Sequence, residues 1–398
     1  MKKRILIVSH ALELGGAERS LIGLLDALDP ALCEVDLFLL RQEGELLHAV
    51  PAHIHLLPAV PAYTVLARPL KTTLKEGHLL LSAARLAGKA AAYLYSKKHR
   101  HTESAVSLEY SHKFTCPFMP QIQPDVTYDL AISFLTPHYF VAQKVHARKK
   151  IAWIHTDYSR IQVDIPSEAA MWDAYDHIIS ISEDVTGTFL STFPTLEQKL
   201  LLIENILPVA LIKQQAALPV PTGDMPPEGI RLLSIGRFCH AKNFDNVPDI
   251  CARLRQAGLN VYWYLIGFGG DEALIREKIA QAQMEKRVIL LGKKENPYPY
   301  IAACDLYVQP SRYEGKAVTV REAQTLGKPV VITRYATSAS QLEEGVDGVI
   351  VPLDNVGCAA GIAALLRDPQ QMAQLAENCR AREYSNAEET KKIYSLME

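Results

Sequence analysis

The sequence carries almost no net charge. Its 398 residues include 42 Lys and Arg against 44 Asp and Glu, which gives a formal net charge of −2. Proteins that bind nucleic acid usually have a basic surplus, so we do not expect nucleic acid as a partner. With 48% hydrophobic and 22% charged residues, the chain is not of a disordered, collagen-like or coiled-coil class. Its length exceeds what one hydrophobic core normally organises, which predicts two domains.

Metal-binding cysteine motifs and long apolar runs are also absent. The seven cysteines are widely spread, with no CxxC and no Cys/His cluster at metal-ligand spacing, which predicts free thiols in a reducing cytoplasm. The longest segment without a charged side chain, Leu46–Ala67, contains three prolines and three histidines, which excludes a membrane-spanning helix there. The apolar run after Met1–Arg4 is too short for a signal peptide. We therefore expect a cytoplasmic protein.

Short apolar runs alternate with longer helical or irregular stretches. Most runs are apolar on both faces, as parallel strands covered by helices must be. In the first half they are Arg4–Ser9, Val35–Leu40, Ile54–Leu57, Leu130–Phe134, Ile151–His155, Ile178–Ile181 and Leu200–Ile203. In the second half they are Leu232–Ile235, Tyr262–Ile266, Val288–Leu291, Leu306–Gln309, Val330–Thr333 and Val349–Val351. These two series predict an α/β protein with two doubly wound, Rossmann-like domains.

Proline marks the boundary between the two domains. Five prolines fall within twenty residues just before the strand that opens at Ile230, and proline withholds the backbone donors that a sheet needs. We predict a first domain over 1–208, a Pro-rich linker over 209–229 and a second domain over 230–370. A polar C-terminal helix over 371–398 packs on its own domain or crosses back to the first one.

One segment departs from this pattern. Leu66–Arg100 contains eight Lys or Arg and a single acid, Glu76, interleaved with Leu, Ala and Tyr. Amphipathic helices of this composition lie on anionic membrane surfaces, which would place the protein peripherally at the inner face of the cell membrane. A solvated helix whose lysines cover apolar neighbours gives the same pattern.

Three loops at predicted strand ends carry candidate ligand contacts, because ligands of open α/β sheets bind there. Gly15 and Gly16 follow the first strand and allow close backbone approach to a ligand, although a simple turn needs the same glycines. Arg237 and Lys242 stand five residues apart, a pairing that suits a diphosphate, although loop cations are commonly just solvated. The third loop reads Gly267–Gly270, but its lack of a third fingerprint glycine argues against a dehydrogenase.

The most informative motif surrounds Glu314. Glu314 and Gly315 precede a helix that we expect to begin near Lys316 and to stop before Gly327. Glu314 would then stand just before free helical N–H groups, and Glu322 lies eight residues further on. One carboxylate would bind sugar hydroxyls and the other the ribose hydroxyls of a nucleotide. A helix cap and a surface glutamate are the alternative.

In their order, these motifs closely resemble those of the retaining glycosyltransferases of family 4, which have the GT-B fold of two Rossmann-like domains facing a cleft. The resemblance covers nearly the whole second domain, and the first more loosely, at Gly15–Glu18 and Ala152–Asp157. The segment Tyr313–Ala323 looks most like enzymes that build capsular, exopolysaccharide or lipopolysaccharide chains. The family commonly has an aromatic residue where Lys316 stands, beside the donor sugar. This difference leaves the identity of the donor sugar open.

The resemblance assigns roles to single residues. Arg237 and Lys242 would neutralise the donor diphosphate. Glu314 would orient the donor sugar, and His155 would lie near the reacting sugar, which completes the expected catalytic set, although a lone histidine at a strand end is usually structural. Glu322 would hold the ribose hydroxyls. The other expected donor-binding residues are Gly15, Gly16, Gly267, Gly292, Lys293, Gly315, Lys316, Ala317 and Val318.

The implied partners are a nucleotide-sugar donor, with UDP as the expected nucleotide, and a glycan or polyprenyl-linked saccharide acceptor. No cofactor or metal is expected: the sequence has no Asp-x-Asp motif, so protein groups would balance the charge on the leaving diphosphate. Two alternatives stay open. An epimerase of GT-B-like fold would need an acid–base constellation that we do not find in the sequence. A non-catalytic nucleotide-sugar-binding partner of another transferase would not need the full set of candidate residues.

Overall fold

The structure is a computed structural model, and it describes residues 2–13, 15–101, 104–135, 138–159, 161–226, 228–314 and 317–398. The chain divides into two compact units. The first consists of Met1–Pro208 together with Asn386–Glu398, and the second of Val209–Ser385.

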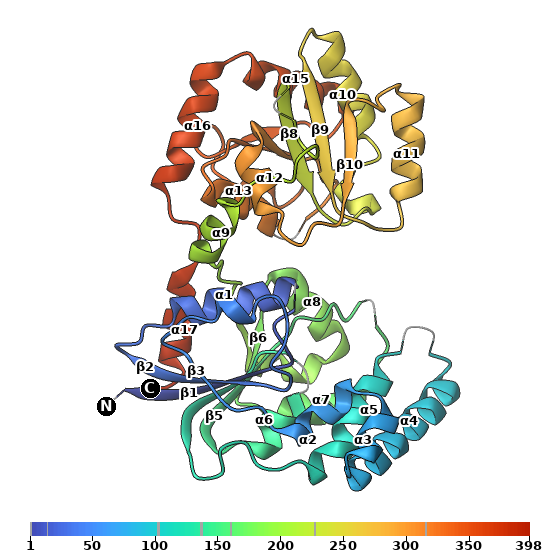
Figure 1. The fold of residues 1–398 in the computed structure, drawn as a ribbon, viewed down its shortest axis with the longest axis vertical. Coiled ribbons are helices and arrows are strands. Elements are labelled where there is room, and N and C mark those ends of the chain that lie inside the picture. Colours follow the sequence, from blue (N-terminus) through green and yellow to red (C-terminus); the bar gives the residue numbers. More distant parts are fainter. Residues whose placement is uncertain are drawn as a thin grey trace. The chain divides into compact units, whose positions relative to one another are not determined.

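Each unit is built on one parallel sheet (Figure 1). The first sheet has the order β3-β2-β1-β4-β5-β6-β7, with β1 (Lys3–Ser9), β2 (Cys33–Leu39), β3 (His55–Leu56), β4 (Tyr128–Ser133), β5 (Ala147–Trp153), β6 (His177–Ser180) and β7 (Leu200–Leu202). The second has the order β10-β9-β8-β11-β12-β13, with β8 (Ile230–Ile235), β9 (Val261–Ile266), β10 (Val288–Gly292), β11 (Leu306–Gln309), β12 (Val330–Thr333) and β13 (Val349–Val351). Both sheets are doubly wound, with topological switch points between β1 and β4 and between β8 and β11. Every apolar run predicted as a strand forms one, and the predicted fold class is confirmed.

Helices cover these sheets, and the central strands are consequently buried on both faces. Ile5–Val8 of β1 and Val330–Ile332 of β12 are completely buried. The helices of the first unit are α1 (Gly16–Ala27), α2 (Pro61–Thr64), α3 (Leu70–Lys75), α4 (Leu79–His99), α5 (Val106–Thr115), α6 (His138–Lys144), α7 (Ile165–Asp173), α8 (Glu183–Thr192) and α17 (Thr390–Ser395). Those of the second unit are α9 (Val209–Ala216), α10 (Val247–Gln256), α11 (Glu272–Gln281), α12 (Tyr298–Ala303), α13 (Val318–Thr325), α14 (Ser338–Gln341), α15 (Asn355–Leu366) and α16 (Pro369–Ala381).

The segment predicted as a linker is not irregular throughout. It begins with α9, which packs on α12, and Leu211 and Ile212 of this helix are buried. Proline composition concealed this helix, since all but the first of the five prolines lie beyond its end.

The predicted C-terminal helix over 371–398 is divided between the two units. The helix α16 belongs to the second unit, and the segment from Asn386 onward returns to the first. Ile393 of α17 is completely buried, and the backbone N–H of Asp29 donates to the Tyr394 hydroxyl at 2.8 Å. At the very end of the chain, Lys3 Nζ donates to the Met397 carbonyl at 2.8 Å.

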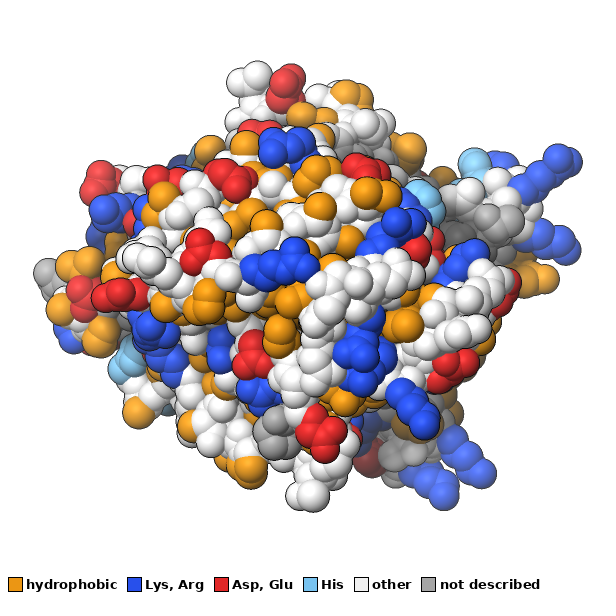
Figure 2. Space-filling view, turned by 90° about the horizontal axis from the view of Figure 1, so that it is seen from above, with side chains coloured by type: hydrophobic (Ala, Val, Ile, Leu, Met, Phe, Trp, Pro, Cys, Tyr) orange, Lys and Arg blue, Asp and Glu red, His pale blue; other side chains and the backbone are white. Residues whose placement is uncertain are grey.

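The basic segment Leu66–Arg100 forms α3 and α4 at the edge of the first unit, where α4 packs on α5 (Figure 1). Gly88 permits this packing, because a Cβ there would lie 2.7 Å from the Tyr110 carbonyl oxygen. Within the described ranges, no helix is both long enough and apolar enough to span a membrane. On the face seen in Figure 2, basic and acidic side chains are interspersed, in keeping with the near-zero net charge.

Candidate functional site

The candidate site lies at the switch point of the second sheet, where the loops after β8 and β11 meet. These loops are tied together by Arg312, whose side chain donates to both carboxylate oxygens of Asp245, at 2.9 and 2.7 Å. Burial opposes ionisation of Asp245, but Arg312 outweighs it and lowers the pKa of that carboxyl. Asn243, in the left-handed conformation at φ 60°, adds a hydrogen bond of 2.8 Å to the Pro310 carbonyl. The two loops therefore form one firmly held platform.

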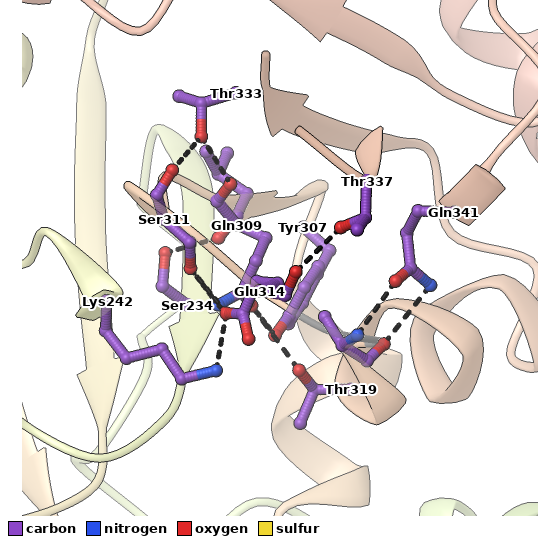
Figure 3. A network of polar contacts seen from close by, with 12 residues as sticks. Ser234, Lys242, Tyr307, Gln309, Ser311, Glu314, Thr319, Thr333, Thr337 and Gln341 are labelled. Atoms are coloured by element: carbon purple, nitrogen blue, oxygen red, sulfur yellow. Dashed lines mark hydrogen bonds and ion pairs between the residues drawn. The ribbon is translucent and has the colours of Figure 1, made fainter. Parts of the chain in front are cut away.

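Glu314 is the centre of a polar network on this platform (Figure 3). Its Oε1 accepts hydrogen bonds from Lys242 Nζ and Ser311 Oγ, both at 2.5 Å, and from Gln309 Nε2 at 3.1 Å. The Glu314 side chain is 10% exposed and that of Lys242 20%. The backbone carbonyl oxygen of Glu314 accepts a hydrogen bond from Thr337 Oγ1 at 2.7 Å. Of the two carboxylate oxygens, only Oε1 is bonded within the described chain, which leaves Oε2 available to a ligand.

Glycines bring the neighbouring loops close to this network. A Cβ at Gly236 would lie 3.1 Å from Cδ and Cε of Lys242, so the lysine stem passes directly over this glycine. Gly267 has φ 150°, and a Cβ there would lie 1.9 Å from the Gly236 carbonyl oxygen. Gly267, predicted as a donor contact, thus has a packing function that its motif did not indicate. Its N–H donates to the Gly292 carbonyl at 3.0 Å, which joins the loop after β10 to the same edge.

The other predicted cations lie on these loops. Arg237 is exposed and makes no ion pair with any residue that the structure describes. Lys293 is exposed, and its Nζ lies 5.7 Å from the centre of the Phe268 ring. Gly292 has φ 70°, with open space where a Cβ would lie. The structure therefore brings the β8, β9, β10 and β11 loops to one edge of the sheet, with two cations free to meet an anion.

Glu322 lies on α13 and is buried, only 4% exposed. Its Oε1 accepts a hydrogen bond of 2.9 Å from the hydroxyl of Tyr298, on α12. The alternative of a surface glutamate is therefore wrong, and its contact with ribose stays a prediction. No spacing in the sequence pointed to Tyr298.

The expected row of free N–H groups before α13 needs a correction. The helix begins at Val318, and the N–H of Ala317 donates to Gln341 Oε1 at 2.8 Å instead of pointing to a ligand. Gln341 competes for this N–H because its own helix, α14, packs against the loop. Val318 is 43% exposed, and Gly315 and Lys316 lie outside the described residues.

The first unit holds the remaining predicted residues. His155 follows β5, and burial lowers its pKa to about 4, so its imidazole is neutral. Gly15 is the N-cap of α1, and a Cβ there would lie 1.9 Å from a carboxylate oxygen of Glu18, whereas Gly16 faces open space. These contacts involve only the flexible end of the Glu18 side chain, which can move aside, so the structure imposes no strict requirement for glycine at either position.

The cysteines of the chain form no disulfide bonds. All seven cysteines are free, and six of them are buried. Over the described ranges, no three His, Cys, Asp or Glu side chains gather as a possible metal site.

Part of the chain is similar in sequence to known proteins. Residues 223–382 match the family model described as glycosyl transferases group 1. The chain is 28% identical over 155 residues to the lipopolysaccharide core biosynthesis glycosyltransferase LpsE of Rhizobium meliloti, which covers 39% of this chain and 44% of that protein. It is 30% identical over 145 residues to the amylovoran biosynthesis glycosyltransferase AmsK of Erwinia amylovora, covering 34% and 35%. The match thus spans less than half the length of these curated relatives.

A solved structure extends the likeness to the whole chain. Anabaena HepE in complex with UDP and glucose superposes with a TM-score of 0.60 at 17% identity, over 99% of this chain and 98% of that chain. Two doubly wound parallel sheets and this likeness define the GT-B fold. The segment that matches the glycosyl transferases group 1 model lies within the second unit.

Proposed function

We propose that the protein is a retaining, metal-independent glycosyltransferase. It moves a sugar from a nucleotide diphosphate sugar, with UDP as the nucleotide, to a glycan or polyprenyl-linked saccharide in surface polysaccharide biosynthesis. The observation that carries the proposal is the Lys242–Glu314 pair, 2.5 Å apart at the switch point where such sheets bind ligands. The names of LpsE and AmsK and the UDP complex of HepE support the biological setting and the nucleotide.

Charge balance explains the choice of residues. Breaking the bond between the sugar C1 and the phosphate oxygen leaves negative charge on the diphosphate, which Arg237 and Lys242 would neutralise from one loop. Glu314 would accept a hydrogen bond from a donor-sugar hydroxyl at Oε2. The acceptor oxygen bonds to C1 on the face that the phosphate leaves, and the acceptor proton passes to a leaving phosphate oxygen. Glu314 is then a positioning carboxylate and not a covalent nucleophile.

Incubation with a panel of UDP-, GDP- and dTDP-sugars and a glycan acceptor mixture tests this function through nucleotide release and product analysis. We expect release from a UDP-sugar in EDTA, with the anomeric configuration retained. Binding of donors without any transfer or hydrolysis would favour a non-catalytic partner. Conversion of the donor to another nucleotide sugar would favour an epimerase.

We further propose that α4 rests on an anionic membrane. The outward face of α4 is apolar, since five large side chains are each more than half exposed: Leu79, Leu80, Leu86, Tyr93 and Leu94. Exposed cations lie at one edge of this face and across its C-terminal end: Lys89, Lys97, Lys98 and Arg100. An apolar stripe with basic side chains at its edge and at its C-terminal end complements a bilayer that carries anionic head groups.

Replacing Lys89, Lys97 and Lys98 together by Gln is expected to weaken binding to phosphatidylglycerol-containing vesicles at least tenfold, measured by co-sedimentation. Each lysine near such a surface contributes about 1 kcal/mol. Exchange of the exposed Lys213 and Lys286 of the second unit serves as the matched control and is expected to leave binding unchanged. The proposal would be contradicted if exchange of the control lysines weakened vesicle binding as much as exchange of the α4 lysines. It would also be contradicted if the wild type bound neutral phosphatidylcholine vesicles equally well.

A further inference from the structure

A cavity of about 80 Å³ lies in the first unit between α5, α6, α7 and the end of β5. A buried water needs about 10–15 Å³ of such space, so the cavity has room for several hydrogen-bonding groups. Leu108, which is more than half exposed, and the exposed Thr156 lie at its edge, so the cavity opens to solvent. Apart from His155, none of its lining residues belongs to the predicted site.

Glu109 of α5 contributes an unpaired carboxylate oxygen to this cavity. The residue is 7% exposed. Its Oε1 accepts hydrogen bonds from the Tyr139 hydroxyl at 2.7 Å and from the Ser167 hydroxyl. Oε2 is buried and has no hydrogen-bond partner in the described part of the chain. Buried polar atoms of native proteins are nearly always paired, so Oε2 calls for a donor from outside the chain. Lys113 is engaged elsewhere, donating to Ser167 Oγ at 2.6 Å.

A second unpaired atom lies in the same wall. His155 Nε2 is buried without a partner among the described residues, and the His155 ring lies 4.7 Å from that of Phe134. Because the imidazole is neutral, Nε2 accepts or donates according to its tautomer. Glu168, also 7% exposed, accepts a hydrogen bond of 2.8 Å from the Tyr158 hydroxyl. The polar part of the wall therefore fits a ligand with several hydroxyl groups.

Aromatic rings supply the apolar part of the wall: Trp153, Tyr158 and Trp172 all line the cavity. Concave sites with apolar ring walls and a few polar groups are typical of small-ligand sites. We infer that the cavity binds an uncharged sugar residue of the acceptor, with one hydroxyl donating to Glu109 Oε2 and another paired with His155 Nε2. That this sugar belongs to the acceptor rests on the proposed function, whereas sugar binding itself does not.

Titration with methyl glycosides of glucose, galactose and N-acetylglucosamine tests this inference through tryptophan fluorescence, because two of the three tryptophans line the cavity. We expect a saturable signal in the wild type and at least tenfold weaker binding in Glu109→Gln. The Gln amide keeps an acceptor for Tyr139 and Ser167 but places an NH₂ group where Oε2 accepts. Glu34→Gln, at an exposed position of β2, is the matched control and is expected to bind like the wild type.

Leu108→Trp, which fills the cavity edge from an exposed position, guards against a folding defect in Glu109→Gln and is also expected to lose binding. UDP binding in the same samples is expected to be unchanged in both variants. No glycoside binding in the wild type, or equal binding by both variants, would overturn the inference. Tighter binding of methyl glucosaminide, a cation, than of methyl glucoside would contradict the inference that the ligand is uncharged. Glycoside binding without any sugar transfer would overturn the proposed function alone.

Discussion

Glu314→Ala is expected to abolish sugar transfer while the chain stays folded. In the proposed reaction its carboxylate fixes the donor sugar, and Lys242, Ser311 and Gln309 hold that carboxylate in place beforehand. Removing one preorganised polar partner of a transition state costs about 10²–10³-fold in kcat. The measurement is product formation at saturating donor, with near-ultraviolet circular dichroism to establish the fold. Glu377→Ala, at an exposed site on α16, is the matched control.

Lys242→Ala tests two roles of Lys242: one in sugar transfer and one in stabilising the platform formed by the loops after β8 and β11. It leaves the largely buried Glu314 without its ammonium partner, so we expect a comparable loss of transfer together with a fall in melting temperature. In Glu314→Ala the lysine is left without its partner but reaches solvent more easily, so the stability cost is smaller. Transfer within twofold of the wild type in either variant would remove that residue from the mechanism.

The strands and the helix end beside the site were predictable because their causes are local. A parallel strand covered on both faces needs a continuous apolar run, and every such run formed a strand. Gly327 has φ 67°, a left-handed conformation that glycine adopts without strain, and α13 ends just before it. The placement of Lys242 and Glu314 at the same edge of the sheet was predictable as well, because both residues follow strands that adjoin the switch point, whereas their direct contact was not predicted.

The contacts that surround these residues were not predictable, because each joins elements with no fixed spacing in the sequence. Gln341 takes the N–H of Ala317 from a separate helix, and Tyr298 reaches Glu322 from α12. Glu109 and Glu168 meet in the cavity wall from α5 and α7, and neither stands in a recognisable motif. Predicting which of these side chains are buried together requires knowledge of how the helices pack, and the periodicity of the sequence does not contain it.

Glu168→Gln is expected to stabilise the chain at pH 8 relative to the wild type and to have little effect near pH 5. Burial raises the pKa of Glu168 to about 7, the Tyr158 hydroxyl opposes the shift, and the carboxylates of Glu109 and Asp164 add to it. In the unfolded chain the pKa of Glu168 is near 4.5. At a pH between about 4.5 and 7, the folded chain therefore keeps a proton on Glu168 that the unfolded chain has lost. The stabilising contribution of Glu168 to the free energy of unfolding is therefore complete below about pH 4.5 and is lost as the pH rises through about 7. The loss amounts to about 3 kcal/mol, which the neutral Gln avoids.

Melting temperature against pH, measured for wild type and variant together, isolates this contribution from that of the buried histidines. Burial lowers the pKa of His112 and His138 to about 3 and that of His155 to about 4, so their contribution is lost as the pH falls through those values from about 6.5. They act in the opposite sense to Glu168, but they are present in both proteins, and their effect cancels in the difference. The difference should therefore grow by several degrees between pH 5 and pH 8. A difference that stays constant over this range, as expected for Glu34→Gln, would mean that Glu168 is ionised in the folded chain throughout and that the cavity wall is more polar than its burial implies.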